Sequence, residues 1–249
     1  MKKQVSLYPE TKTQEVTPQR KKELLALCEE FKKLTGGVAC CADALDFLGF
    51  RNCVMSTNIK PYTPEKGRLC GLAYTIRGLN ITGLPKDTAE VREVVDVEYY
   101  DNIEPGYVIT YGTDIEATGA AIIGDVLSTF AASRGAVGAV IDGPIRDIER
   151  IAPLDFITFG HGIHPVSGEG RVLWIEYNCI TQVGGVWVEP FDILFGDNDG
   201  VIVIPKHLAK KVLEMAKDIC NKEDAIKADF FKHPEMKMFE VFDLHNRRP

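Results

Sequence analysis

The chain is predicted to fold as a mixed α/β sandwich, and three features of its sequence predict this class. Short apolar runs that are typical of strands, separated by Gly and Pro residues, dominate its second half. Patterns of helical spacing lie at both ends of the chain and between some of these runs. The 249 residues, of which 45% are hydrophobic and 26% charged, are enough to enclose one full core.

The N-terminal part is predicted to hold an arm and two helices. Residues 1–17 are polar and are interpreted as a flexible arm. Thr17 before Pro18 has the form of a helix start, because Thr is a good N-cap and Pro is favoured at the first helical position. Gly36 ends that helical run, and a second helix is expected over 38–49.

The rest of one domain, 18–230, is predicted to alternate strands with a few helices. Helices are expected at roughly 86–100 and 125–134, and a long one from 205 to about 230. The tail, 231–249, is amphipathic. Strands are expected at 71–78, 107–112, 136–142, 156–160, 184–190, 192–196 and 200–205.

Composition excludes several classes of function. A net charge of −7 argues against nonspecific binding to nucleic acid or to an anionic membrane. No apolar run reaches the length of a membrane span, and the N-terminus lacks the apolar segment of a secretory signal. The seven cysteines are odd in number, and none forms a C-x-x-C pair. We therefore expect reduced thiols and a cytoplasmic protein.

The most informative motif is Asp125, then twenty residues, then Arg146 and Asp147. A helix begins at Asp125, an apolar strand follows, and a Gly-Pro turn leads to Arg146. Because a helix followed by a strand and a turn returns to one edge of a sheet, the three side chains are expected to converge. Two carboxylates and a guanidinium suit a divalent cation that holds an anionic substrate. Taken singly, a plain N-cap and a surface ion pair are the simpler interpretations.

The start of this helix also predicts an anion site. The backbone amides of Val126 and Leu127 belong to the first turn, whose N–H groups have no partner within the helix. Together with the helix dipole, these amides suit a carboxylate.

Two other patterns are weaker. Asp197 to Gly200 resembles a calcium loop, but its spacing would put Lys206 where the last carboxylate ligand belongs, so a hairpin turn is expected. His161 and His164 are three residues apart in a Gly-containing loop, where lining of the loop is a simpler interpretation than a zinc pair.

The motif also carries a family resemblance. Residues 124–151, with further similarity at 183–205 and 42–45, resemble the 4-hydroxy-4-methyl-2-oxoglutarate / 4-carboxy-4-hydroxy-2-oxoadipate aldolases. These aldolases share a superfamily with the regulator of ribonuclease activity A. The resemblance implies a swivelling β/β/α-type fold with N- and C-terminal helices. It also implies a homotrimer or hexamer with the active site between subunits. One departure is Phe191, which stands where the family leads us to expect Gly after Pro190.

The resemblance further implies a Mg²⁺ or Mn²⁺ ion and retro-aldol cleavage of a small 2-oxo acid that releases pyruvate. Asp147 would bind the metal directly, and Asp125 would hold a metal-bound water or act as a base. Arg146 would bind the pyruvyl group and stabilise its enolate. The amides of Val126 and Leu127, after Gly124, would hold the carboxylate. A carboxylate from the C-terminal helix of the adjacent subunit would complete the water shell, and Glu223 is the residue that we expect there.

Two functions from different classes remain open at this point. The first is the metal-dependent pyruvate aldolase, with decarboxylation of oxaloacetate as a side activity because it passes through the same enolate. The second is a non-enzymatic regulator that binds an RNA-processing protein. The complete set of Asp125, Arg146 and Asp147 favours the enzyme, since a binding protein needs none of them.

Overall fold

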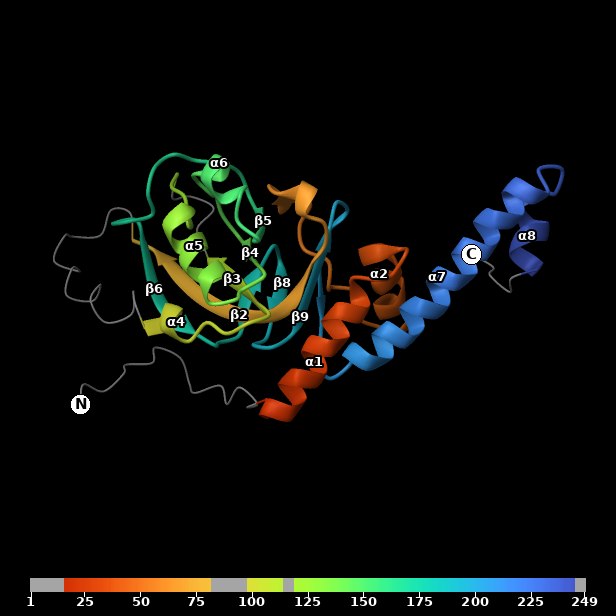
Figure 1. Ribbon diagram of the computed structural model, residues 1–249, viewed down its shortest axis with the longest axis horizontal. Coiled ribbons are helices and arrows are strands. Elements are labelled where there is room, and N and C mark those ends of the chain that lie inside the picture. Colours follow the sequence, from red (N-terminus) through yellow and green to blue (C-terminus); the bar gives the residue numbers. More distant parts are fainter. Residues whose placement is uncertain (1–15, 82–97, 114–118, 245–249) are drawn as a thin grey trace.

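The computed structural model describes residues 16–81, 98–113 and 119–244, and its centre is a mixed sheet of eight strands (Figure 1). A separate hairpin of two short strands, β7 (Thr181–Val183) and β8 (Val186–Val188), accompanies this sheet. The eight strands are β1 (Lys60–Pro61), β2 (Leu69–Asn80), β3 (Tyr107–Thr113), β4 (Gly138–Ile141), β5 (Ile157–Gly160), β6 (Val172–Tyr177), β9 (Ile193–Asp197) and β10 (Gly200–Ile204).

The order of the strands is β1-β5-β4-β3-β2-β9-β10, and β6 pairs with the far part of β2. Strands β2 to β5 are parallel neighbours, whereas β1, β6, β9 and β10 are antiparallel to the strands that they pair with. The predicted fold class, an α/β sandwich of the swivelling type with helices at both ends, is therefore confirmed.

The described helices form two groups (Figure 1). Helices α1, α2 and α7 lie together on one side of the sheet, and α7 leads away from the sheet to α8. Helices α5 and α6 lie at the other end of the molecule. The bounds are α1 (Pro18–Phe31), α2 (Gly37–Phe47), α4 (Glu98–Asp101), α5 (Asp125–Ser133), α6 (Ile148–Ile151), α7 (Ala209–Lys232) and α8 (Met238–Leu244), with a 3-10 helix η1 (Pro64–Lys66).

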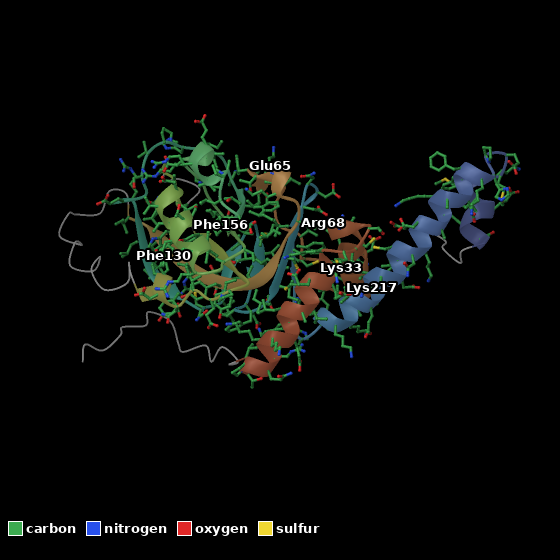
Figure 2. All side chains as sticks on the ribbon, in the orientation of Figure 1. Lys33, Glu65, Arg68, Phe130, Phe156 and Lys217 are labelled. Carbon is green, nitrogen blue, oxygen red and sulfur yellow. The ribbon has the colours of Figure 1, made fainter. Side chains whose placement is uncertain are left out.

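Helix α1 begins as predicted and is fastened to α7. The Thr17 hydroxyl accepts a hydrogen bond from the Arg20 amide at 3.2 Å. Glu30 accepts hydrogen bonds from Lys33 at 2.6 Å and from Lys217 of α7 at 2.7 Å. Figure 2 shows Lys33 and Lys217 together where the two helices meet. The hydrogen bonds from Lys217 and Lys33 lower the pKa of Glu30 to about 2.

The core has two parts, one on each face of the sheet, because successive side chains of a strand point to opposite faces. On β10, Ile202 and Ile204 face the helices, and Val201 and Val203 face the side of the β7–β8 hairpin. This period of two is the expected pattern for a sheet that is covered on both faces. The sheet is thus fixed from both sides, which gives the loops at its ends a rigid base.

Most predicted elements are confirmed within one to four residues at their ends, and a few were missed. Strands β1, β6 and β7 were not predicted, and most of the helix expected at 86–100 lies outside the described residues, as does nearly all of the 1–17 arm.

The tail packs back on its own chain, because Phe242 of α8 meets Phe230 of α7 with ring centroids 6.3 Å apart. All seven cysteines are free and buried. None of the described helices combines the length and apolar character that a membrane span requires.

Asp197 to Gly200 forms the turn between β9 and β10, as expected. One carboxylate oxygen of Asp197 accepts a hydrogen bond from the Val38 amide at 2.9 Å, and the other accepts one from the Asp199 amide at 2.9 Å. This carboxylate therefore holds the start of α2 and the turn itself.

Candidate active site

The loop after β4 returns to the start of α5, so the two halves of the sequence motif meet. Ile145 pairs with Ile123 in an isolated parallel bridge, and the Arg146 amide donates to the Ile123 carbonyl at 3.0 Å. Asp125 begins α5 directly after this bridge. The predicted convergence of Asp125, Arg146 and Asp147 is confirmed, and backbone pairing produces it.

Gly124 is required at this meeting point by the close approach of side chains. Its backbone is extended, a conformation that any residue can adopt. A Cβ placed on Gly124 would lie 2.7 Å from Asp147 Oδ2 and 2.8 Å from Arg146 Nε. Any larger residue would push these two functional groups away from the helix start.

Asp147 is held in a left-handed conformation, with φ 58° and ψ 35°. This region is unfavourable for most residues but is tolerated by Asp and Asn. Its Oδ2 atom accepts a hydrogen bond from the Asp125 amide at 3.4 Å and lies 3.4 Å from Arg146 Nε. Backbone strain of this kind concentrates at functional sites, which supports a functional role for this carboxylate.

The side chain of Asp125 does not cap its own helix, which removes the simpler interpretation of this residue as a plain N-cap. Gly124 is the N-cap residue, and the Asp125 carboxylate instead forms an ion pair with Arg150, with 2.9 Å between Oδ2 and Nε. The Asp125 side chain is 13% exposed, whereas that of Arg150 is 76% exposed. Sequence analysis missed Arg150. No sequence signal marks it, because an exposed arginine in the short helix α6 shows no sign of the carboxylate that it contacts.

A cavity of about 270 Å³ opens at this meeting point. Gly124, Val126, Leu127 and Arg146 all line it. The Ser128 amide donates to the Gly124 carbonyl at 3.1 Å, which closes the first turn of α5. The amides of Val126 and Leu127 belong to that first turn, where the helix itself provides no acceptor. An anionic group in the cavity therefore meets amide donors, the helix dipole and a guanidinium.

The carboxylates present fit one class of metal ion. Among the residues that the structure describes, no group of three or more His, Cys, Asp or Glu side chains is arranged to hold a metal. Asp147 and Asp125 lie beside two of its lining residues, since Asp147 Oδ2 is 3.4 Å from Arg146 Nε and Asp125 follows Gly124. Magnesium and manganese ions are often held by one or two carboxylates, with water and substrate oxygens completing the shell. The donor set therefore fits Mg²⁺ or Mn²⁺ and does not fit a four-ligand zinc cage.

The remaining candidate residues lie elsewhere. Glu223 is on α7, 3.8 Å from Cys40 Sγ of α2, and α7 lies across the molecule from α5 and α6 (Figure 1). The chain does not bring Glu223 to its own Asp147, so its role in an adjacent subunit stays a prediction. His161 and His164 follow β5, and His164 Nδ1 accepts a hydrogen bond from the Val166 amide at 3.2 Å, as expected for a loop residue.

Comparisons with known proteins identify relatives of the chain. The chain is 31% identical over 188 residues to protein DlpA of Legionella pneumophila, which covers 75% of this chain but only 29% of DlpA. It is 33% identical to a Halalkalibacterium halodurans protein named "Putative 4-hydroxy-4-methyl-2-oxoglutarate aldolase", over 72% of this chain and 77% of that protein.

Solved structures show the same fold. Streptomyces coelicolor RraAS2, named as an unusual member of the RNase ES inhibitor RraA protein family, aligns with a TM-score of 0.68 and 22% identity. The alignment covers 80% of this chain and 94% of RraAS2. The sequence model of the RraA-like family, described as Aldolase/RraA, matches residues 38–203, a range that contains the whole Asp125, Arg146 and Asp147 motif. This match covers more than half of the chain, which therefore belongs to the RraA-like family.

Proposed function

We propose that this protein is a divalent-metal-dependent aldolase that cleaves a 4-hydroxy-2-oxo acid and releases pyruvate. The observation that carries the proposal is the meeting of Arg146, Asp147 and Asp125 with the first turn of α5 at one cavity. The relatives named as aldolases support the reaction class.

The pyruvyl end of the substrate is assigned to the start of α5. Its carboxylate accepts hydrogen bonds from the amides of Val126 and Leu127, and the helix dipole adds to this attraction. Arg146 lines the same cavity and offers a planar fork to the carboxylate and the neighbouring 2-oxo group. The absence of a side chain at Gly124 lets the Arg146 guanidinium lie close to the start of α5.

Cleavage then needs the removal of one proton and the stabilisation of one negative charge. The C4 hydroxyl loses its proton to a water or base that Asp125 holds, the C3–C4 bond breaks, and its electron pair moves onto the 2-oxo oxygen. Arg146 stabilises that oxyanion, and reprotonation at C3 gives pyruvate. A divalent cation on Asp147 would supply a Lewis acid for the same oxyanion. Loss of the C4 carboxylate from oxaloacetate would leave the same enolate, so this decarboxylation belongs to the proposal as a side activity.

The decisive experiment measures pyruvate release from a panel of 4-hydroxy-2-oxo acids with and without metal. Chelator should abolish release, and Mg²⁺ or Mn²⁺ should restore it. Asp147→Asn is the matched variant, because Asn keeps the left-handed backbone and loses only the charge. We expect it to lower both metal affinity, read by calorimetry, and kcat. Full activity in excess chelator would reject the metal.

The assembly is also part of the proposal. Side chains around the site are apolar and exposed, with Val126 at 72%, Ile163 at 60% and Val166 at 37%. Exposed apolar side chains gathered at one place are typical of a surface that another subunit covers. We therefore place the site between subunits of a homotrimer or hexamer, with Glu223 of the adjacent subunit near the metal-bound water.

Complementation tests this arrangement. Asp147→Ala and Glu223→Ala should each be nearly inactive. When the two variants are refolded together, random assembly joins an intact Asp147 to a neighbour's intact Glu223 at roughly a quarter of the interfaces. Activity should recover to about that fraction. Proven mixed oligomers without recovery would mean that the site is not shared in this way, and a fully active Glu223→Ala would reject the residue.

The regulator of an RNA-processing protein is the alternative, and the same assays separate it from the enzyme. A regulator has no use for a guanidinium and two carboxylates beside free amide donors. If no 2-oxo acid is cleaved and the protein instead slows an endoribonuclease, the enzyme proposal is wrong.

A further inference from the structure

The cavity at the candidate site has an aromatic side as well as a charged one. Tyr99, Tyr100 and Trp174 line it together with Arg146. The rings of Tyr99 and Tyr100 lie 4.4 Å apart, and those of Tyr99 and Trp174 lie 6.4 Å apart. At 1%, 5% and 8% exposure, the three residues are packed too tightly to change rotamer easily. They form a fixed wall.

The hydroxyl groups of Tyr99 and Tyr100 form hydrogen bonds inside the protein. The hydroxyls of Tyr100 and Tyr99 both form hydrogen bonds with the hydroxyl of Tyr111 on β3, which is fully buried. Burial raises the pKa of Tyr111 well above its usual value, so this hydroxyl stays neutral. Because the hydroxyls point to Tyr111, Tyr99 and Tyr100 offer the cavity carbon surface rather than hydrogen bonds.

Trp174 is fixed by a glycine on the neighbouring strand. It pairs in register with Gly78 of β2, and a Cβ on Gly78 would lie 2.7 Å from two atoms of the indole ring. The missing side chain lets the indole lie against β2, with its centroid 4.6 Å from that of Tyr111. The position of the indole at the cavity is therefore set by the sheet.

Few charged side chains of the described residues line the cavity. Among the described residues that line it, the charged side chains are Arg146 and Glu169. Arg146 is assigned to the pyruvyl end. Glu169 is exposed, and its carboxylate would repel another anion at close range. A second carboxylate on the substrate would meet a negative charge and aromatic carbon.

The size of the cavity limits what the rest of the substrate can be. Ligand pockets usually have volumes of about 300–1,000 Å³. At about 270 Å³, this one is small, and the pyruvyl end takes part of that space. The space beyond it suits a short alkyl chain or a single aromatic ring.

We infer that the substrate carries an uncharged apolar or aromatic group at C4, in place of the second carboxylate of 4-hydroxy-4-methyl-2-oxoglutarate. Tyr99, Tyr100 and Trp174 bind this group, and Glu169 selects against an anion. The inference rests on the proposed function, since it describes the other half of the same substrate. Cleavage of the C3–C4 bond then yields pyruvate and a neutral aldehyde or ketone, the C4 hydroxyl becoming its carbonyl.

A matched pair of substrates tests the inference with the full-length protein and Mg²⁺. 4-Hydroxy-4-methyl-2-oxopentanoate differs from 4-hydroxy-4-methyl-2-oxoglutarate only by a methyl group in place of the second carboxylate. We expect kcat/KM for pyruvate release to favour the methyl compound by about tenfold or more, a discrimination that a hydrophobic pocket can provide. The phenyl compound 4-hydroxy-2-oxo-4-phenylbutanoate should also be cleaved. A preference for the dicarboxylate would overturn the inference.

Substitutions in the cavity test which residues determine the preference for the uncharged substrate. Glu169→Lys should shift the ratio of kcat/KM values about tenfold towards the dicarboxylate, and Glu169→Gln should shift it less. Glu65→Lys makes the same charge change on the exposed η1 helix, outside the cavity, and should not shift the ratio (Figure 2). Trp174→Leu should lower the ratio of the phenyl to the methyl compound several-fold. An unchanged ratio in Glu169→Lys would remove Glu169 from the inference and overturn its electrostatic part.

A separate measurement distinguishes this failure from failure of the proposed function. Exchange of the methyl protons of pyruvate with deuterated water reports enolate formation and needs no acceptor half. Without exchange and without cleavage of any substrate, the proposed function is wrong. Exchange together with better cleavage of the dicarboxylate, or with no cleavage of the neutral compounds, keeps the enolate chemistry and overturns the inference about the substrate.

Discussion

Helix α5 has a cavity at each end, and the two cavities differ in how their charged groups are used. The cavity at its start has a volume of about 270 Å³ and contains Arg146. The cavity at its end has a volume of about 520 Å³ and is lined by three basic side chains and one carboxylate. Those four residues are Lys32, Lys66, Arg68 and Asp155. By size and charge alone, the second cavity is the better candidate for an anion site.

The basic groups of the larger cavity are largely occupied in holding the fold. The Arg68 guanidinium donates to the carbonyls of Lys32 at 3.2 Å and Thr35 at 3.5 Å, and also to that of Leu34. These carbonyls follow α1, where the helix leaves its last acceptors unpaired. Figure 2 shows Arg68 where the helices meet the sheet. Lys32 forms an ion pair with Glu29 at 2.8 Å.

The contrast shows that available hydrogen-bond donors mark a site better than volume does. At the smaller cavity, the first-turn amides of Val126 and Leu127 have no acceptor in the helix. Arg146 lies there beside a strained Asp147. At the larger cavity, the donors of Arg68 and Lys32 already have acceptors within the protein. Substitutions at the two ends should therefore separate loss of activity from loss of stability.

The largest effect is expected for Arg146→Lys. Lysine keeps the charge but cannot reproduce the bidentate fork, so kcat should fall by two or more orders of magnitude, which is about 3 kcal/mol in the barrier. The melting temperature should hardly change, because the Arg146 side chain is 38% exposed and its ion pair is long at 3.4 Å. Steady-state kinetics and calorimetry on the same sample give both values. Near-normal kcat with a large drop in melting temperature would make Arg146 structural.

Arg68→Met should give the opposite result. It removes a charged donor from carbonyls at the end of α1, and we expect a loss of about 2 kcal/mol in the free energy of unfolding. The kcat of the folded protein should stay the same. Lys66→Met is the matched control at the same cavity and should cost less than about 0.5 kcal/mol. Denaturant unfolding measures both, and equal losses in the two variants would contradict the assignment.

The two ends were not equally predictable from the sequence. The convergence of Asp125 with Arg146 was predictable, because helix, strand and turn patterns dictate where the chain returns. Arg150 was missed, since an exposed arginine in a helix carries no sign of the carboxylate that it will meet. Strand β6 was missed because its burial is incomplete and does not alternate cleanly. Arg68 was missed because it donates to carbonyls at the end of α1 that are more than thirty residues away in the sequence.

Strain offers a second comparison, since Phe191 is left-handed like Asp147, with φ 68°. Here the ring packs beside Tyr107 at 6.1 Å, far from any expected chemistry, where the family pattern leads us to expect Gly. Phe191→Ala and Phe191→Gly both lose the ring, but only Gly relieves the backbone. We therefore expect Gly to be about 1 kcal/mol more stable than Ala, which reverses their usual order. Thermal unfolding of the two variants measures the difference, and the usual order would mean that the strain is absent.

The smallest effect is expected for Arg150→Gln, although Arg150 lies closest to Asp125. Its side chain is 76% exposed, and ion pairs between exposed groups contribute about 0–1 kcal/mol. We therefore expect the substitution to change kcat/KM less than about fivefold. At high salt, where such ion pairs are screened, the wild type and the variant should have nearly the same kcat/KM. The measurement is kcat/KM for wild type and variant at low and high ionic strength. A loss of a hundredfold or more would show that Arg150 contacts the substrate or holds Asp125 in its working position, and the charged side of the cavity would then have to include it beside Arg146.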